Sequence, residues 1–171
     1  FVTPLAVSFI SPLDGDTLSR PDIMVHGTVT NPLGNEVGVC VNGILAVVYG
    51  DQFVANHVPL QEGENTITAI VTDIDGNTAT ASIAINAVTA ENYIRITADT
   101  DSSVSPFETT LEVEGTFSFP ESSISHTGPG TVEFLDSASQ EYRVKISGEG
   151  IYYFTANVTD DQGVNLTDTF G

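Results

Sequence analysis

Basic residues are nearly missing from this chain. Its 171 residues include 4 Lys and Arg against 23 Asp and Glu, a formal net charge of −19 at pH 7. Nine acids oppose one basic residue over residues 1–88, and fourteen oppose three over residues 89–171, so both halves are acidic. A surface of this sign repels phosphate backbones and anionic lipids. We therefore expect no nucleic-acid partner and no direct membrane insertion.

Cysteine, tryptophan and long apolar runs are also scarce. The single cysteine, Cys40, excludes an intrachain disulfide, and there is no Trp. No apolar run approaches the roughly 20 residues of a membrane-spanning helix, and no window places apolar residues at helical spacing over three turns. Hydrophobic residues nevertheless make up 40% of the chain, which is enough for packed cores.

What the chain does contain is period-2 alternation in short runs separated by turn residues. Val37, Val39 and Val41 alternate, for example, and are followed by Asn42-Gly43, a strong hairpin signal. The pattern predicts strands near residues 5–10, 22–30, 36–41, 44–49, 52–60, 65–72 and 78–86, and then near 92–98, 109–117, 131–136, 141–146, 150–159 and 165–170. Strands this short and this frequent are typical of two-sheet sandwiches.

The alternation lapses around residues 88–91 and then begins again. We therefore predict an all-β chain of two tandem immunoglobulin-like β-sandwiches, residues 1–88 and residues 89–171. Residues 118–130 have the weakest pattern and room for one more short strand. The last strand stops at Gly171, so we expect a longer natural polypeptide whose neighbouring domains are this chain's first partners.

The first half resembles a known family. Residues 62–69 read Glu-Gly-Glu-Asn-Thr-Ile-Thr-Ala, residues 72–77 read Thr-Asp-Ile-Asp-Gly-Asn, and residues 9–15 read Phe-Ile-Ser-Pro-Leu-Asp-Gly. With Asn42-Gly43, these motifs closely resemble the bacterial immunoglobulin-like module first described as domain B of glucodextranase, over nearly all of residues 5–87. Between Phe53 and Leu60 the chain has one residue more than that family usually has. A β-bulge near Asn56–His57 would restore the alternation.

The second half resembles a PKD-type module. Residues 105–111 (Ser-Pro-Phe-Glu-Thr-Thr-Leu) are similar to its opening, and residues 150–160 (Gly-Ile-Tyr-Tyr-Phe-Thr-Ala-Asn-Val-Thr-Asp) to its closing strand and turn. The family's central Trp-Asp-Phe-Gly-Asp-Gly stretch is missing. Both resemblances imply extracellular or cell-surface spacers, adhesive stalks or accessory modules of secreted enzymes. Neither implies catalysis.

The residues themselves predict no catalytic group. His26 falls on the outward side of its strand, His57 at the expected bulge and His126 in a loop of the other half, so no Ser-His-Asp or Cys-His arrangement can be built within one module. Cys40 alternates away from its neighbouring valines and has no base nearby to lower its pKa. We interpret it as a structural cysteine.

The aromatic residues allow a structural and a binding interpretation. Tyr152 stands at the start of the penultimate strand, where a tyrosine corner places a hydroxyl that bonds back to the chain. The four aromatic residues most open to partial exposure are Tyr49, Tyr93, Phe107 and Tyr153. A glycan-binding platform would need two or three such rings in one plane.

The carboxylates suggest a calcium hypothesis. The direction of the strands in a sandwich determines the pole at which each turn lies. On this basis one group of acids should gather where the first module ends and another where the second begins. A hard divalent cation would relieve the repulsion between their like charges. The candidate ligands of this interdomain site are Asp14, Asp16, Glu62, Glu64, Glu91, Glu121, Asp160 and Asp161. The pairs Asp73 and Asp75, and Asp99 and Asp101, could repeat the arrangement with neighbouring modules. The alternative is ordinary turn chemistry, in which Asp, Asn and Gly need no metal.

Together these features predict a non-enzymatic, extracellular spacer or interaction module of a larger bacterial surface or secreted protein. One alternative is a carbohydrate-binding accessory module of a polysaccharide-degrading enzyme. Another is an adhesin or surface-layer segment that binds a protein partner, including through the exposed edge of the strand at 165–170.

Overall fold

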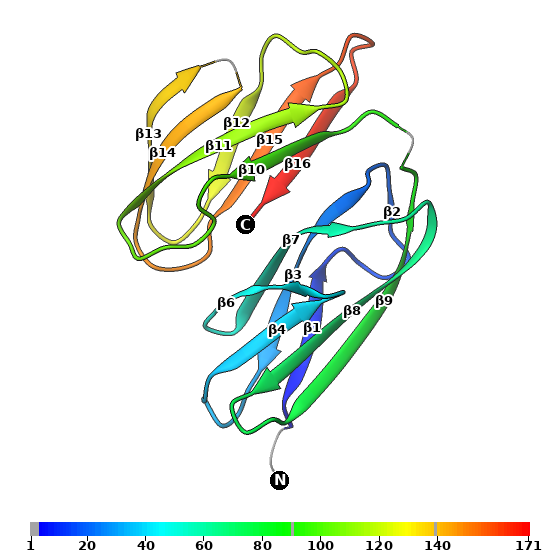
Figure 1. Cartoon of the computed structure of the whole chain (residues 1–171), viewed down its shortest axis with the longest axis vertical. Helices are drawn as coiled ribbons and strands as arrows, with labels where there is room; N and C mark the ends of the chain where they lie inside the picture. The colour runs from blue at the N-terminus through cyan, green and yellow to red at the C-terminus, as the bar shows by residue number, and fades with distance from the viewer. Residues whose placement is uncertain (1–3, 90, 139) are drawn as a thin grey trace. The chain divides into compact units, whose positions relative to one another are not determined.

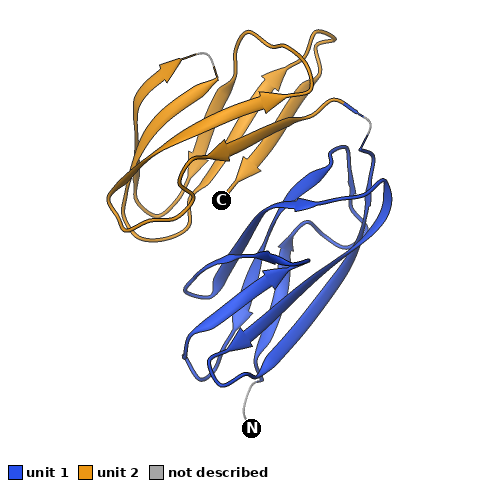
Figure 2. Cartoon of the chain, viewed as in Figure 1, with its two compact units in different colours: residues 1–91 blue, residues 92–171 orange. Residues whose placement is uncertain are grey.

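The computed structural model describes residues 4–89, 91–138 and 140–171. Backbone contacts divide the chain into two compact units, residues 1–91 and residues 92–171, which Figure 2 shows in blue and orange. The described residues form strands and turns and contain no α-helix, so the predicted all-β class is confirmed. The same residues accordingly include no helix that could span a membrane.

Unit 1 is a sandwich of two sheets (Figure 1). Its described strands are β1 (Ala6–Ser11), β2 (Thr17–Leu18), β3 (Asp22–Thr30), β4 (Val37–Val41), β5 (Ile44–Leu45), β6 (Val47–Tyr49), β7 (Gln52–Pro59), β8 (Gly63–Asp73) and β9 (Thr78–Ala87). One sheet has the order β1-β3-β7-β6 and the other β2-β9-β8-β4-β5. Neighbouring strands are antiparallel except for β2 and β9, which are parallel.

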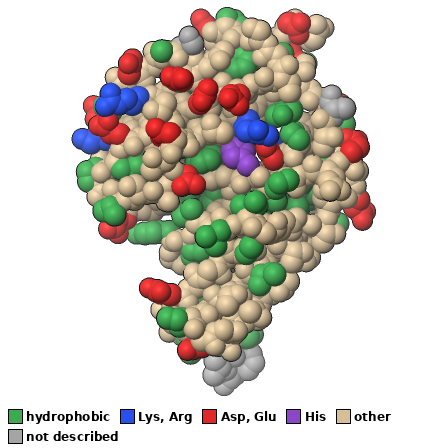
Figure 3. Space-filling model, in the orientation of Figure 1, with side chains coloured by type: hydrophobic (Ala, Val, Ile, Leu, Met, Phe, Trp, Pro, Cys, Tyr) green, Lys and Arg blue, Asp and Glu red, His purple; other side chains and the backbone are tan. Residues whose placement is uncertain are grey.

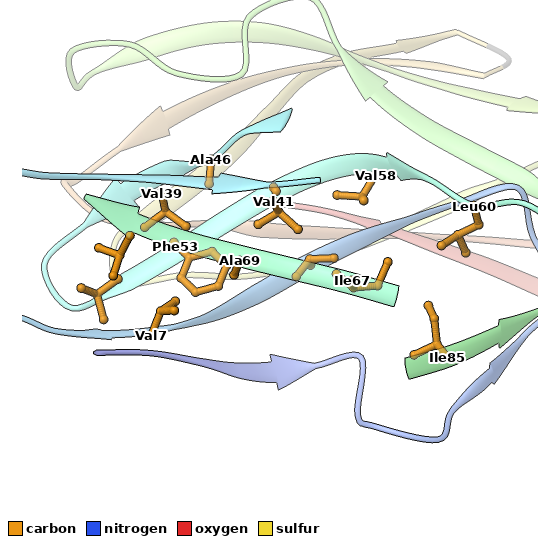
Figure 4. Close-up of a cluster of buried hydrophobic side chains, with 14 of the residues drawn as sticks. Val7, Val39, Val41, Ala46, Phe53, Val58, Leu60, Ile67, Ala69 and Ile85 are labelled. Carbon is orange, nitrogen blue, oxygen red and sulfur yellow. The ribbon is translucent and has the colours of Figure 1, made fainter. Parts of the chain in front are cut away.

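The core of unit 1 follows the period-2 pattern of the sequence. Along β8, Ile67, Ala69 and Val71 have no exposed surface, whereas Ile70 on the opposite face of the strand is 42% exposed. Figure 4 shows the buried side chains of the two sheets meeting between them, with the ring of Phe53 among them. Each buried aliphatic side chain removed from water contributes about 1.5–3 kcal/mol. The sandwich is thus held together by every second residue of its longer strands.

The bulge expected near Asn56–His57 is confirmed. Ile23 on β3 pairs with Val58, but Val25 pairs with Ala55. The two intervening residues of β7 therefore face one residue of β3, and His57 adopts a left-handed backbone with φ of 52°. Because the extra residue is absorbed there, Ala55 and Val58 both point into the core.

Two strand predictions in unit 1 are corrected by the structure. The single strand expected at 44–49 is divided: β5 pairs with β4 in one sheet, and β6 pairs with β7 in the other. Ala46 is buried between them, at the point where the chain crosses from sheet to sheet. The strand β2 was not predicted either, because two residues are too few to show the alternation of apolar and polar side chains.

Unit 2 is a second sandwich. Its described strands are β10 (Ile94–Ala98), β11 (Phe107–Gly115), β12 (Ser123–Thr127), β13 (Thr131–Ala138), β14 (Glu141–Ser147), β15 (Tyr153–Thr159) and β16 (Asn165–Phe170). The sheets have the orders β10-β11-β14-β13 and β12-β15-β16. The uncertain stretch 118–130 provides the buried ring of Phe119 and the edge strand β12. Phe154, Ala156 and Val158 alternate along β15 and are buried.

Gly27 tests how tightly β3 is packed against its two neighbouring strands in one sheet of unit 1. It lies on β3 between Phe9 of β1 and Phe53 of β7. A Cβ atom built there would lie 2.0 Å from the carbonyl oxygen of Ser8 and 2.7 Å from Cε1 of Phe53. We expect Gly27→Ala to lower the free energy of unfolding by about 1–3 kcal/mol or more, because the strands and the ring must move apart.

Urea denaturation followed by circular dichroism measures this change. Gly38→Ala on β4 is the matched control, since a Cβ at Gly38 meets no atom within 4 Å. Equal stability of the two variants would contradict the close packing at Gly27.

Candidate functional site

The predicted acids of unit 1 lie around the end of β9, where three of the four accept hydrogen bonds. Asp14 accepts the amide N–H of Ala84 at 2.8 Å, and Asp16 accepts the amide N–H of Leu13 at 2.8 Å. Glu62 accepts both the amide N–H of Thr89 at 2.6 Å and its hydroxyl at 2.9 Å. The fourth acid, Glu64, lies on β8 directly beside Asn86 of β9. The structure thus brings these four residues to the same pole of the unit.

The predicted acids of unit 2 follow the same rule in part. Oδ1 of Asp160 accepts the amide N–H groups of Gln162 at 2.9 Å and Val164 at 2.8 Å, which closes the turn between β15 and β16. Asp161 and Glu121 are exposed, as is Glu91. Figure 3 shows many carboxylate side chains and few basic ones on one face of the molecule.

Over the described ranges of the chain, no three His, Cys, Asp or Glu side chains are grouped closely enough to hold a metal ion. A calcium site shared by the two units stays a prediction. What the structure does show is that Asp14, Asp16, Glu62 and Asp160 each accept a backbone N–H group.

Asp73 and Asp99 also accept several hydrogen bonds each. Asp73 accepts the side-chain amide of Asn77 at 2.9 Å and the backbone N–H groups of Asn77 and Asp75 at 2.8 and 3.0 Å. Asp99 accepts the hydroxyl of Thr109 at 2.6 Å and the amide N–H of Thr110 at 2.8 Å. Hydrogen bonds stabilise the ionised form, so the Asn77 side chain lowers the pKa of Asp73 and the Thr109 hydroxyl lowers the pKa of Asp99. The backbone N–H of Thr89 likewise lowers the pKa of Glu62.

The three histidines occupy separate structural environments. His26 is partly buried on β3, and this burial lowers its pKa. His57 lies at the bulge with Nδ1 3.6 Å from the carboxylate of Asp22. His126 lies on the edge strand β12, rather than in the predicted loop, with its ring centroid 6.0 Å from that of Phe134. Cys40 is a free, partly exposed thiol on β4.

The sequence patterns did not predict that the carboxylates of Asp22 and Asp168 are buried. Asp22 is 5% exposed and pairs with the guanidinium of Arg20, Nη2 to Oδ1, at 3.1 Å. Asp168 on β16 is also 5% exposed and accepts the backbone N–H of Ile96 on β10 at 2.9 Å. The second had a visible signal, because Asp168 alternates in phase with Phe170 and so falls on the inward face of its strand.

Tyr152 adopts the arrangement expected of a tyrosine corner. Its hydroxyl donates toward the carbonyl oxygens of Ser147 and Gly148, at 3.0 and 3.1 Å. The ring lies against a bend of small residues: a Cβ at Gly128 would be 2.2 Å from Cδ1 of the ring, and one at Gly130 2.2 Å from its hydroxyl oxygen. The buried ring therefore has a structural role. Of the other aromatic side chains considered for glycan binding, Tyr49 is 48% exposed, and the remaining three are partly buried.

Removing the Tyr152 hydroxyl should leave the ring packed and the two carbonyls without their donor. We expect Tyr152→Phe to lower the free energy of unfolding by about 1–2 kcal/mol. Calorimetric unfolding measures the loss. The control in the same unit is Tyr93→Phe, which retains the ring that lies 5.8 Å from the guanidinium carbon of Arg95. A loss no greater than that of the control would show that the hydroxyl does not hold the corner.

The capped carboxylates also predict how stability depends on pH. Because the pKa values of Glu62, Asp73 and Asp99 are lowered by folding, the folded chain binds fewer protons than the unfolded chain in acid. Their contribution is complete above the ordinary carboxyl pKa of about 4 and is lost as the pH falls through the lower values of the folded state. We expect the melting temperature to decrease below about pH 5, and Asp73→Asn to weaken that dependence.

Melting curves recorded by circular dichroism between neutral and acid pH test this expectation. Asp51→Asn, at the exposed turn between β6 and β7, is the control for the loss of one negative charge. A pH profile identical in both variants and in the unmodified chain would count against the role of Asp73.

Comparison with known proteins adds the evolutionary context. No curated protein matches the chain in sequence. Among solved structures, the fibronectin(III)-like modules of Clostridium thermocellum CbhA share 15% identity over 95% of this chain and 90% of theirs, with a TM-score of 0.36. Latent PorU of Porphyromonas gingivalis shares 14% over 97% of this chain and 20% of its own, with a TM-score of 0.45. Extracellular cadherin domains 1–4 of protocadherin gamma B7 share 12%, with a TM-score of 0.34, and the chain spans 49% of their length.

The family comparison is more informative for unit 1. Residues 5–89 match the family model of glucodextranase, domain B. The match spans every described strand of the unit, from β1 to β9, and includes the bulge at Asn56–His57 and the turn that Asp73 caps. Residues 5–89 of this chain therefore belong to the glucodextranase domain B family, as an immunoglobulin-like β-sandwich module.

Proposed function

We propose that this chain is a non-catalytic, extracellular spacer and interaction module of a larger bacterial surface or secreted protein. The observation that carries the proposal is the polarity of each unit, which receives the polypeptide at one pole and releases it at the other. A module with this property adds its own length to a polypeptide. The family of unit 1, an accessory module rather than a catalytic domain, supports the same conclusion.

The polarity of unit 1 follows from strand pairing. β3 runs from Asp22 at one pole to Thr30 at the other, and β1 begins beside Thr30. Pro59, at the end of β7, pairs with Asp22, and the next strand begins at Gly63, which pairs with Ala87 at the end of β9. The chain therefore enters near Thr30 and leaves near the pole of Asp22. The 11 residues of β8 set the length gained at about 36 Å.

Unit 2 has the same polarity. β10 begins at Ile94, which pairs with Gly115 at the end of β11. β16 ends at Phe170, which pairs with Phe154 at the start of β15. Since β15 begins at the pole where β14 ends, and β14 ends beside the start of β11, Phe170 lies at the pole opposite Gly115. The acidic surface of both units favours solvation and leaves the interaction with other molecules to neutral or cationic partners.

A replacement experiment tests the spacer role. In the full-length polypeptide, residues 1–171 are exchanged for an unrelated pair of immunoglobulin-like domains of similar length, and in a second variant for unit 1 alone. We expect the exchange to preserve the activity or adhesion of the parent protein, because a spacer contributes length, and the shortened variant to reduce it. Loss of function in the exchanged protein would overturn the spacer role and point to a specific surface of this chain.

The isolated 171-residue chain provides the complementary measurement. Affinity electrophoresis in polysaccharide gels, together with a reducing-sugar assay, should show unchanged migration and no product. Retarded migration would favour the carbohydrate-binding alternative, and released sugar would overturn the non-catalytic assignment.

A further inference from the structure

The beginning and the end of unit 1 are joined by backbone hydrogen bonds. The amide N–H of Gly15 donates to the carbonyl of Ala84 at 2.7 Å. In the opposite direction, Asn86 donates to the carbonyl of Asp16 at 2.8 Å and Val88 donates to that of Leu18, also at 2.8 Å. These bonds bracket the parallel pairing of β2 with β9. The first strand reaches β9 because the chain leaves the sheet of β1 at residues 12–16 and joins the other sheet as β2.

The parallel orientation determines how these bonds respond to tension. The polypeptide enters unit 1 at one pole and leaves it at the other. Tension at the entry first loads the pairing of β1 with β3 and then pulls β2 back toward the entry pole, while β9 is pulled toward the exit pole. Two parallel strands pulled in this way slide along each other, and all the bonds between them are loaded together. In an antiparallel hairpin pulled from its open end, the bonds would instead break one after another. Loading in parallel raises the barrier that governs forced unfolding.

Two carboxylates strengthen the same junction. Asp14, just before the paired segment, accepts the amide N–H of Ala84 at 2.8 Å, which adds a side-chain bond to the backbone series. Glu62 holds the residue through which the chain leaves, accepting the backbone N–H and the hydroxyl of Thr89. Bonds to a charged acceptor are about twice as strong as neutral ones. Tension arriving from the exit side must therefore break the Glu62–Thr89 contacts as well as slide β9 past β2.

We propose that the junction of Gly15–Leu18 with Ala84–Val88 is a mechanical clamp through which unit 1 bears tension along the polypeptide. The proposal rests on the spacer role and extends it from passive length to load. A spacer can function without bearing load, so failure of the clamp would leave the replacement experiment above unaffected.

Asn86→Pro is the sharpest variant. Proline removes the N–H that donates to Asp16. Because the N–H groups of Ala84, Asn86 and Val88 all donate to residues 14–18, the ladder between β9 and β8 is not deprived of a donor. The matched control is Thr80→Pro, on the same edge of the same strand but outside the segment that pairs with β2.

Single-molecule force spectroscopy of the whole chain, tethered at its two ends, gives the decisive measurement. The native chain should show two unfolding events, each lengthening the tether by roughly 3.3–3.6 Å per residue released. We expect Asn86→Pro to lower the rupture force of one event and leave the other unchanged, and Thr80→Pro to retain both forces. Melting temperatures of the two variants measure their equilibrium cost, so that a loss specific to the clamp is visible as a lower force at similar thermal stability.

Asp14→Ala provides a variant that leaves the backbone intact, should proline at position 86 prevent folding. It removes only the side-chain acceptor for Ala84, and Asp51→Ala is its control at an exposed turn. A lower rupture force in Asp14→Ala but not in Asp51→Ala supports the clamp. Unchanged forces in the folded clamp variants, or equal losses in the clamp variants and their controls, would overturn it.

Discussion

The structure depends on the alternation of side chains along a strand, which allows only every second residue to reach a core. In unit 1 this places Val25, Phe53 and Ile67 between two sheets, while Gln52 and Thr66, the residues before Phe53 and Ile67, are exposed. Of the ten acids of unit 1, seven lie in turns or loops, and Asp22, Glu64 and Asp73 lie on strands at or near their ends. In unit 2 the outward faces of the strands carry acids as well, among them Glu108, Glu112 and Glu114 on β11.

Alternation is also the reason why much of the fold could be predicted from the sequence. It identifies the strands and their inward faces. The bulge at Asn56–His57 was predicted instead from the resemblance to the glucodextranase domain B family, because the chain has one residue more than that family between Phe53 and Leu60. It does not identify the partner of a strand. The division of residues 44–49 between two sheets leaves the pattern unchanged, and β2 is held by the backbone of β9 rather than by any feature of its own two residues. Pairing is a property of distant segments, and a single sequence carries little information about it.

The carboxylates show the same limit at the level of the site. Their positions in turns were readable, and the preference of Asp for such positions is well understood. The hydrogen-bond donors that they meet could not be predicted, because Asp14 accepts an amide N–H 70 residues away and Asp168 accepts one 72 residues away. Asp168 is instructive because its phase along β16 marked it as inward-facing. An acid on an apolar face must find a donor, and this one binds the N–H of Ile96 where the edge strands of the two sheets meet.

After β1 the chain leaves one sheet and joins the other as β2. This change of sheet determines how a spacer built from unit 1 could bear a load. Had β1 remained in its own sheet up to β3, the entry of the chain would be tied only to β3, and β9 would be an edge strand with a row of open N–H groups. By crossing over at residues 12–16, the chain covers that edge and binds its own exit segment. Asp14 and Glu62 reinforce the same place as hydrogen-bond acceptors. The crossover at residues 12–16 therefore covers the edge of β9 and closes the sandwich. It also places hydrogen bonds between the entry and exit segments of the unit, where tension along the polypeptide is applied.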